Sequence, residues 1–388
     1  MLVPELQKID PCVAPRGTNI PEHATAVIDI DLEIIKHNYL FLQSNLAPGC
    51  QSAAVLKANA YGLGASRIGK ALLEVGCQHF FAATLEEAIE LRQALKNSQI
   101  SIFKLNGLLP GMEKLCLEYD ITPVLNAPEQ ISFWAQVAKN YGRRLPAAFH
   151  IDTGLCRAGI NREYGPEIAN DTELFSYLDI KFILSHLACS DQPGHEKNKI
   201  QLDRFKNVLQ YFPHIPASFC NSHGIFLGKD YHFQQVRPGR SLYGVGSRSL
   251  TAQGFRQAIQ VYVKILQVRD VAPGESVGYN ATYHISRPSR LAILSMGYAD
   301  GLLRTRTHKG VFHIQGHPAY IAGRISMDLV TVDVTDVPQQ YLYPGAWVEY
   351  IGDHMSVDDA AEAAGTISHE ILVNLGSRYF KNYLSAGE

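Results

Sequence analysis

Apolar residues recur every three or four positions along residues 32–43, and this spacing predicts an amphipathic helix. Eight short apolar runs follow before Gly244, and helical patterns such as 85–95 and 202–212 lie between them. Strand–helix units at this spacing predict an α/β fold, a (β/α)8 TIM-type barrel over residues 32–250. An open doubly wound sheet is the alternative. The eight runs are 52–60, 79–84, 101–106, 121–126, 147–154, 180–188, 216–222 and 234–239.

After about Ala258 the pattern changes to β-rich segments separated by Gly and Pro turns. No long helical pattern lies between these segments, although a helical stretch is expected at 357–365. The sequence therefore predicts that a C-terminal all-β domain follows the barrel, a β-strand-rich unit formed by residues 251–388 together with 1–31. Residues 1–31 are assigned to it because their apolar segment precedes the first barrel helix.

Composition narrows the class of protein. Of the 388 residues, 46% are hydrophobic and 19% charged, and the formal net charge is −2, so nothing indicates a nucleic-acid or membrane surface. The first 17 residues lack the apolar run of a secretory signal, and no segment has the length and apolarity of a membrane span. The seven cysteines are scattered without a CxxC pair, which favours reduced thiols in a cytoplasmic protein over a disulfide frame or a metal site.

Reactive side chains stand near the C-terminal ends of the predicted strands, where barrel enzymes carry their active sites. A lone lysine in an apolar strand is usually a residue whose amine extends to water. That interpretation loses weight here because several polar groups converge on one face of the predicted barrel. The positions are Lys57, Arg157, His186, Asn221, Ser222, Arg237 and Gly239.

The segment 54–64, AVLKANAYGLG, carries the strongest local signal. A lysine at the end of an apolar strand is desolvated, which favours the neutral amine that attacks an aldehyde. The string closely resembles the signature of the alanine racemase family around its pyridoxal phosphate (PLP) lysine. Further segments resemble the family in the same order, from about Ala26 to the C-terminus. They are 150–160, 185–193, 219–224, 236–245, 276–283, 295–301 and 323–335.

The resemblance implies an isomerase, a PLP-dependent racemase that interconverts L-alanine and D-alanine, with Lys57 holding PLP as a Schiff base. It also implies that the phosphate is held by Tyr61, Ser222 and the backbone amides of Gly239 and Arg240, as at other barrel phosphate sites. Taken alone, Ser222 would be read as a turn or helix-capping serine.

Arg237 is implied as the partner of the pyridine nitrogen. Arginine does not readily give up its proton, so the ring nitrogen stays unprotonated and the ring is a weaker electron sink, which disfavours transamination. Leu105 would pack near the ring, and His186 and Asn221 would support it. Taken alone, Leu105 would be read as a core residue and His186 as a structural histidine.

Racemisation needs a proton taken from one face of Cα and another delivered to the opposite face, for which two bases are the economical solution. The resemblance assigns Lys57 to one face and Tyr279 to the other. A free tyrosine has a pKa of about 10, so it needs a cationic or polar neighbour to act as a base. Arg157 is that neighbour, and it also binds the substrate carboxylate. Without its motif, Tyr279 would be read as a packed aromatic residue.

Tyr298 and the backbone of Met327 are implied at the same substrate end. In the family, Tyr279 and Met327 reach in from the other subunit, so a homodimer with shared active sites is expected. The metabolic role that the family implies is the supply of D-alanine for cell-wall synthesis. No metal is expected.

Four positions depart from the family's common pattern. His150 replaces a lysine that is carbamylated in many relatives and steers the substrate arginine, so Arg157 needs another partner: His150 itself, a water or an anion. Leu63 replaces a histidine, His369 replaces a tyrosine that reaches the phosphate, and Arg240 replaces an aliphatic residue. We expect Arg240 or His369 to add positive charge near the phosphate; the alternative is that Arg240 points to solvent.

Other functions stay open at this point. One is a racemase for serine, lysine or a broad range of amino acids. Another is a PLP decarboxylase built from a barrel and a β domain, against which Arg237 argues because those enzymes usually place an acidic residue there. A third is a non-catalytic PLP carrier, against which the full C-terminal domain with Tyr279 argues.

Overall fold

The structure is a computed structural model that describes residues 13–17, 19–246 and 254–385. The chain divides into two compact units, Glu33–Arg256 and Met1–Leu32 with Gln257–Glu388. Among the described residues, no helix is long and apolar enough to cross a membrane.

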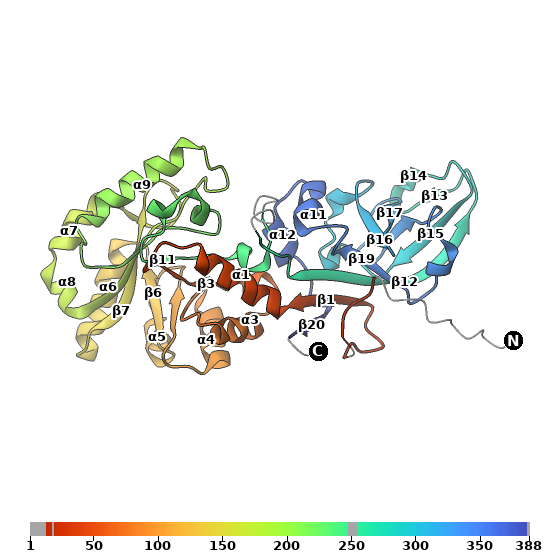
Figure 1. Cartoon of the computed structure of the whole chain (residues 1–388). Coiled ribbons are helices and arrows are strands. Elements are labelled where there is room, and N and C mark those ends of the chain that lie inside the picture. Colours follow the sequence, from red (N-terminus) through yellow and green to blue (C-terminus); the bar gives the residue numbers. More distant parts are fainter. Residues whose placement is uncertain (1–12, 18, 247–253, 386–388) are drawn as a thin grey trace. The chain divides into compact units, whose positions relative to one another are not determined.

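The unit Glu33–Arg256 contains a closed ring of parallel strands, with helices on its outer side (Figure 1). The short strands β2 and β3 flank Ala53 and act as one strand of the ring, because β2 pairs with β11 and β3 pairs with β4. Between them the order is β11-β10-β9-β7-β6-β5-β4. This closure confirms the predicted (β/α)8 barrel and excludes the open doubly wound sheet.

The ring strands and one short side strand are β2 (Gln51–Ser52), β3 (Ala54–Val55), β4 (His79–Ala82), β5 (Ser101–Lys104), β6 (Ile121–Leu125), β7 (Leu145–Asp152), β8 (Ile160–Asn161), β9 (Leu178–Leu184), β10 (Ala217–Ser218) and β11 (Gln235–Val236). The helices are α1 (Leu32–Ser44), α2 (Lys57–Tyr61), α3 (Ala65–Glu74), α4 (Leu85–Leu95), α5 (Glu113–Glu118), α6 (Pro128–Tyr141), α7 (Gly165–Asn170), α8 (Thr172–Tyr177) and α9 (Glu196–Leu209). Four short 3₁₀ turns are η1 (Arg162–Tyr164), η2 (Gly224–Leu227), η3 (Lys229–Tyr231) and η4 (Arg240–Tyr243).

Alternate side chains of the barrel strands form one buried apolar cluster. Phe81 on β4 and Phe103 on β5 stack at its centre, with ring centroids 4.7 Å apart. Leu105, directly after β5, packs against this cluster. The remaining members are Ala53, Val55, Val124, Ala148, Phe182 and Leu184.

Helix α4 spans Leu85–Leu95, in agreement with the apolar pattern over the same residues. Its first turn is closed by a capping box in which Thr84 and Glu87 bond reciprocally to each other's backbone N–H. Helix α9 starts at Glu196, six residues before the predicted start at 202. His195 caps this first turn, in a stretch that has no apolar repeat to indicate a helix.

The second unit is built on an eight-stranded sheet in the order β15-β18-β17-β16-β19-β12-β1-β20. Strand β12 bridges it: the first half pairs with β1 and β19, and the second half pairs with β15, so six of the strands close into a small barrel. All pairings are antiparallel except β1 with β20. The N-terminal strand thus pairs with strands of the C-terminal region, and β20 completes that edge as a strand that the apolar pattern had not marked.

The strands of this unit are β1 (Ala26–Asp31), β12 (Ile259–Val271), β13 (Ser276–Val277), β14 (Tyr283–His284), β15 (Ser289–Leu294), β16 (Val311–Ile314), β17 (His317–Ile321), β18 (Val330–Asp333), β19 (Trp347–Ile351) and β20 (Phe380–Leu384). The helical elements are α11 (Val357–Ala364), α12 (Ser368–Val373) and the 3₁₀ turns η5 (Tyr279–Ala281), η6 (Tyr298–Asp300), η7 (Arg304–Arg306) and η8 (Gln339–Tyr341).

Candidate active site

Lys57 lies just beyond the C-terminal end of β3, where it starts a tight turn of unusual backbone geometry. The four residues 58–61 all have positive φ, between 52° and 58°, in a region that non-glycine residues rarely enter. Glu87 fixes this turn, because its Oε1 accepts from the Ala58 N–H at 2.6 Å and its Oε2 accepts from the Ala83 N–H at 2.9 Å. The strained turn therefore sets where the Lys57 side chain begins.

The electrostatic setting of Lys57 favours its neutral amine. Removal from water lowers the pKa of Lys57, the nearby Arg157 guanidinium lowers this pKa further, and Glu87 opposes both. Within the described part of the chain, the Lys57 amine has no hydrogen bond. No neighbouring group among the described residues therefore competes for this nucleophilic amine.

Hydroxyls and backbone amides gather where β11 leads into η4. Ser222, buried after β10, accepts hydrogen bonds from the Gly239 N–H at 3.0 Å and from the Ser241 N–H at 3.3 Å. A Cβ at Gly239 would overlap the Tyr61 hydroxyl, so the backbone and the phenol meet only because residue 239 is glycine. These donors at a helical N-terminus suit a dianionic phosphate.

Arg240 directs its guanidinium toward His223, where Nη2 lies in contact with the imidazole. It also lies near Tyr61: burial raises the pKa of the Tyr61 phenol to about 12, and Arg240 opposes that rise. A positive side chain therefore stands beside the hydroxyl and amide group of Tyr61, Ser222 and Gly239.

Arg237 is buried at the end of β11 and is held at both ends of its guanidinium group. Nη1 donates to Ser218 Oγ, and Nη2 donates to the Ser185 carbonyl. Burial lowers the pKa of Arg237 to about 10, so the group stays protonated near neutral pH. These two contacts fix the directions in which its remaining N–H groups point.

The polar groups His186 and Asn221 lie at the ends of β9 and β10. Burial, with Arg237 and Arg157 nearby, holds the pKa of His186 well below its usual range, so its imidazole is neutral. Asn221 Oδ1 accepts from Ser190 Oγ at 2.7 Å and from the Gly224 N–H at 3.0 Å. Both residues lie at the same barrel end, and the Asn221 side chain is held by these two hydrogen bonds.

The remaining sequence-predicted residues belong to the second unit. Tyr279, Tyr298 and Met327 are 68%, 44% and 54% exposed. The loops of Tyr298 and Met327 adjoin, because the Tyr298 N–H donates to the Ser326 carbonyl at 3.0 Å and the Ala299 N–H donates to the Met327 carbonyl at 3.0 Å. His369 lies on α12 of the same unit and is half-buried.

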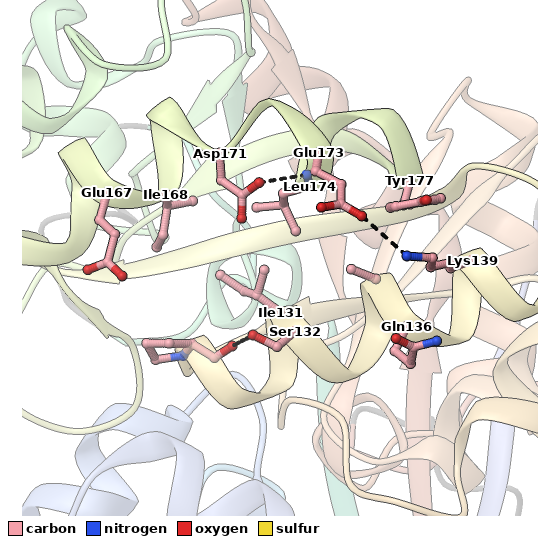
Figure 2. Close-up of a pocket in the computed structure, with 12 residues that line it drawn as sticks. Ile131, Ser132, Gln136, Lys139, Glu167, Ile168, Asp171, Glu173, Leu174 and Tyr177 are labelled. Atoms are coloured by element: carbon pink, nitrogen blue, oxygen red, sulfur yellow. Dashed lines mark hydrogen bonds and ion pairs between the residues drawn. The ribbon is translucent and has the colours of Figure 1, made fainter.

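A separate cavity of about 270 Å³ lies between α6 and the pair α7 and α8 (Figure 2). Lys139 forms an ion pair of 3.3 Å with Glu173 at one side of it, and Asp171 caps α8. None of the residues considered above lines this cavity. Nor does any group of three His, Cys, Asp or Glu within the described ranges form a metal site.

Sequence reasoning missed several residues that hold this site. Ser185, Ser218 and Ser241 contact Arg237 or Ser222, and Glu87 fixes the turn after Lys57. Asn126 contacts His150. Ser185 and Asn126 directly follow apolar strands, and this position is a signal that could have identified them. Glu87 carried no such signal, because its place in the helix predicts only a capping role and not the contact with Ala58.

Comparison with known proteins gives a consistent result over nearly the whole chain. The family model "Alanine racemase, N-terminal domain" matches residues 30–247, and "Alanine racemase, C-terminal domain" matches residues 258–383. The catabolic alanine racemase of Agrobacterium fabrum is 42% identical over 364 residues, which cover 94% of this chain and 93% of that protein. The alanine racemase of Brucella ovis is 40% identical, covering 93% and 94%.

Solved structures agree in fold. Alanine racemase from Bartonella henselae with covalently bound pyridoxal phosphate superposes with a TM-score of 0.88 at 39% identity, covering 93% of this chain and 100% of that one. The biosynthetic alanine racemase from Pseudomonas aeruginosa gives a TM-score of 0.84 at 32% identity, again covering 93% and 100%.

Proposed function

Since the chain belongs to the alanine racemase family, we propose that it is a PLP-dependent isomerase that interconverts L-alanine and D-alanine. The observation that carries this proposal is the placement of Lys57. It is a desolvated lysine with a lowered pKa at the C-terminal end of a barrel strand, in a chain that matches the family over both of its domains.

The residues present fit PLP. Lys57 offers an amine of lowered pKa for the aldehyde, and the glycine at 239 lets the Tyr61 hydroxyl approach the backbone beside Ser222, where a phosphate would be held. Arg240 would add a positive side chain at that end, and His369 is a second candidate for this role. Leu105, His186 and Asn221 would border the ring.

Two bases on opposite faces of Cα carry the reaction in this proposal. When bound, PLP supplies an electron sink for the negative charge that develops on Cα. Lys57 takes or returns the proton on one face, and the phenol of Tyr279 does so on the other. The exposed position of Tyr279 supports its reaching a second chain.

Arg237 would hold the pyridine nitrogen. Its fixed contacts to Ser218 and the Ser185 carbonyl leave it charged and oriented. A partner that keeps its proton limits how far charge spreads into the ring, which favours prompt return of the proton to Cα over transamination.

The substrate end is formed by Arg157, Tyr298 and Met327. Arg157 would bind the carboxylate, because a guanidinium matches its two oxygens. We propose a homodimer in which the exposed loops of Tyr279, Tyr298 and Met327 complete the partner's site.

The domains of this proposal are a barrel of residues 32–250 and a second domain of residues 1–31 with 251–388. We also propose that the protein is located in the cytoplasm.

A racemisation assay tests the function. The purified chain with PLP should convert L-alanine to D-alanine, measured by chiral chromatography, and Tyr279→Phe should slow this by at least about a hundredfold if a catalytic base is lost. Racemisation of Tyr279→Phe at the parent rate would contradict the two-base assignment. A panel with serine and lysine separates other specificities, and release of carbon dioxide would indicate a decarboxylase.

A further inference from the structure

Asn126 and His150 form a pair at the C-terminal ends of β6 and β7 whose geometry defines the state of the imidazole. Asn126 is fixed: its Nδ2 donates to the Leu105 carbonyl at 2.9 Å and to the Val124 carbonyl at 3.2 Å, and its N–H donates to Gln130 Oε1 at 2.8 Å. Because both Nδ2 partners are carbonyls, the amide cannot be turned around, and Oδ1 must face His150.

His150 Nδ1 lies 2.7 Å from Asn126 Oδ1. An amide oxygen only accepts, so Nδ1 must carry the proton and donate it. In a neutral imidazole the other nitrogen, Nε2, is then an unprotonated acceptor. Asn126 thus selects the tautomer of His150.

The surroundings of His150 keep it neutral. Burial first, and then Arg237 and Arg157, lower the pKa of His150 to about 4, and Asp152 opposes them. His186 belongs to the same cluster, since Arg237, Arg157, His150 and Lys57 all lower the pKa of His186. His150 therefore presents a neutral acceptor to a group of cations near neutral pH.

The two arginines beside His150 differ in their partners. Arg237 already donates to Ser218 and to the Ser185 carbonyl. Arg157 makes no hydrogen bond or ion pair within the described ranges, although its loop is anchored because Asp152 accepts from the N–H groups of residues 154–156. Arg157 is thus the cation whose side chain still needs an acceptor.

We infer that in the PLP-loaded protein His150 Nε2 accepts a hydrogen bond from the Arg157 guanidinium, a contact that the two residues do not make in this structure. Asn126, by fixing the tautomer, makes this contact possible. His150 and Asn126 are then positioning residues, which set Arg157 for the substrate carboxylate without touching the substrate. The inference rests on the proposed function, in which Arg157 binds that carboxylate. An acceptor at one edge of the planar guanidinium also fixes the orientation of its plane, which a two-point contact with a carboxylate requires.

Two probes that are halves of alanine separate this role from a general structural one. Propionate keeps the carboxylate and lacks the amine, whereas ethylamine keeps the amine and lacks the carboxylate. Their affinities for the PLP-loaded protein are measured from the cofactor's absorbance, without turnover. His150→Leu removes the acceptor, and His150→Gln supplies an amide oxygen in its place.

We expect His150→Leu to lower the affinity for propionate by about tenfold, which is the cost of losing a hydrogen bond to a charged group. The affinity for ethylamine should stay within about twofold of the parent. His150→Gln should hold propionate within about threefold of the parent. Unchanged propionate affinity in His150→Leu, or equal weakening of both probes, would overturn the inference.

Asn126→Leu keeps the test decisive if His150→Leu does not fold. This variant leaves His150 in place but no longer fixes which ring nitrogen carries the proton. The affinity for propionate should therefore fall by about threefold or more, whereas the affinity for ethylamine should not. Parental propionate binding in Asn126→Leu would overturn the role of Asn126. If the parent binds propionate yet does not racemise alanine, the proposed function fails while the His150 contact is still judged by the propionate series.

Discussion

Two lysines, half-buried Lys57 and buried Lys104, illustrate how partners decide reactivity at the scale of single residues. Burial is the main cause that lowers the pKa of both Lys57 and Lys104. The Lys104 amine donates to the Gly107 carbonyl at 2.5 Å and is thereby used to close a loop. The Lys57 amine has no such bond within the described residues and faces Arg157. A lowered pKa alone would not distinguish the two lysines; the hydrogen bond that the Lys104 amine donates does.

The charge on Arg157 should set the pH at which apoprotein takes up PLP. Arg157 lowers the pKa of Lys57, so Arg157→Gln should raise that pKa and move the midpoint of uptake to higher pH. Glu87 raises the pKa of Lys57, so Glu87→Gln should move the midpoint the other way. The measurement is the rate of cofactor absorbance change against pH, and shifts of the same sign in both variants would refute this account.

Gly239 should be required for cofactor binding. A methyl group there overlaps the Tyr61 hydroxyl, so Gly239→Ala should weaken PLP by at least about tenfold. Gly194→Ala is the matched control, because a Cβ at Gly194 meets nothing within 4 Å. Titration of apoprotein by fluorescence reports both affinities, and parental affinity in Gly239→Ala would rule out a phosphate at this place.

At the scale of elements, helix α4 couples a common capping motif to the active-site turn. Glu87 closes the capping box with Thr84 and also accepts from the Ala58 N–H in the left-handed turn. The first turn of α4 therefore helps to fix the position of Lys57, because Glu87 holds the strained turn that follows Lys57.

The two functions of Glu87 should be separable by mutation. Glu87→Ala leaves backbone donors unpaired, so it should lower the free energy of unfolding by about 1–3 kcal/mol and weaken PLP as well. Thr84→Ala removes only the cap, at about 1 kcal/mol, and should leave PLP affinity unchanged. Chemical denaturation and PLP titration of both variants check this; equal PLP affinity in the two would show that the bond to Ala58 is irrelevant.

The barrel and its reactive strand ends could be predicted because apolar runs and the polar residues after them are local features of the sequence. Helix α4 matched its pattern for the same reason. Asn126 also directly follows an apolar strand, but it was missed because a single asparagine there is also the usual residue of a turn. Ring closure through Ala53 and the pairing of β1 with β20 depend on contacts distant in sequence, which no local pattern encodes.

At the scale of the whole molecule, the proposed chemistry is divided between two units. Lys57 belongs to the barrel, whereas Tyr279 belongs to the β-rich unit and is 68% exposed. If Tyr279 serves the partner's barrel, neither chain alone has a complete pair of bases, and dimerisation is part of catalysis.

Mixing two inactive variants tests this division. Dimers re-formed from equal amounts of Lys57→Ala and Tyr279→Phe should recover about a quarter of the parental racemase activity, because half are hybrids with one complete site of two. Each variant alone should stay inactive. If the mixture recovers nothing although hybrid dimers form, as seen by mass spectrometry of the intact assembly, the two bases belong to the same chain.

The central claim is that Lys57 is the cofactor's anchor, and borohydride reduction tests it most directly. Reduction of the PLP-loaded protein followed by peptide mass mapping should place one pyridoxyl phosphate group on Lys57, with loss of the cofactor's visible absorbance. A label on Lys104, the buried lysine that likewise has a lowered pKa, or no covalent label at all, would contradict the account.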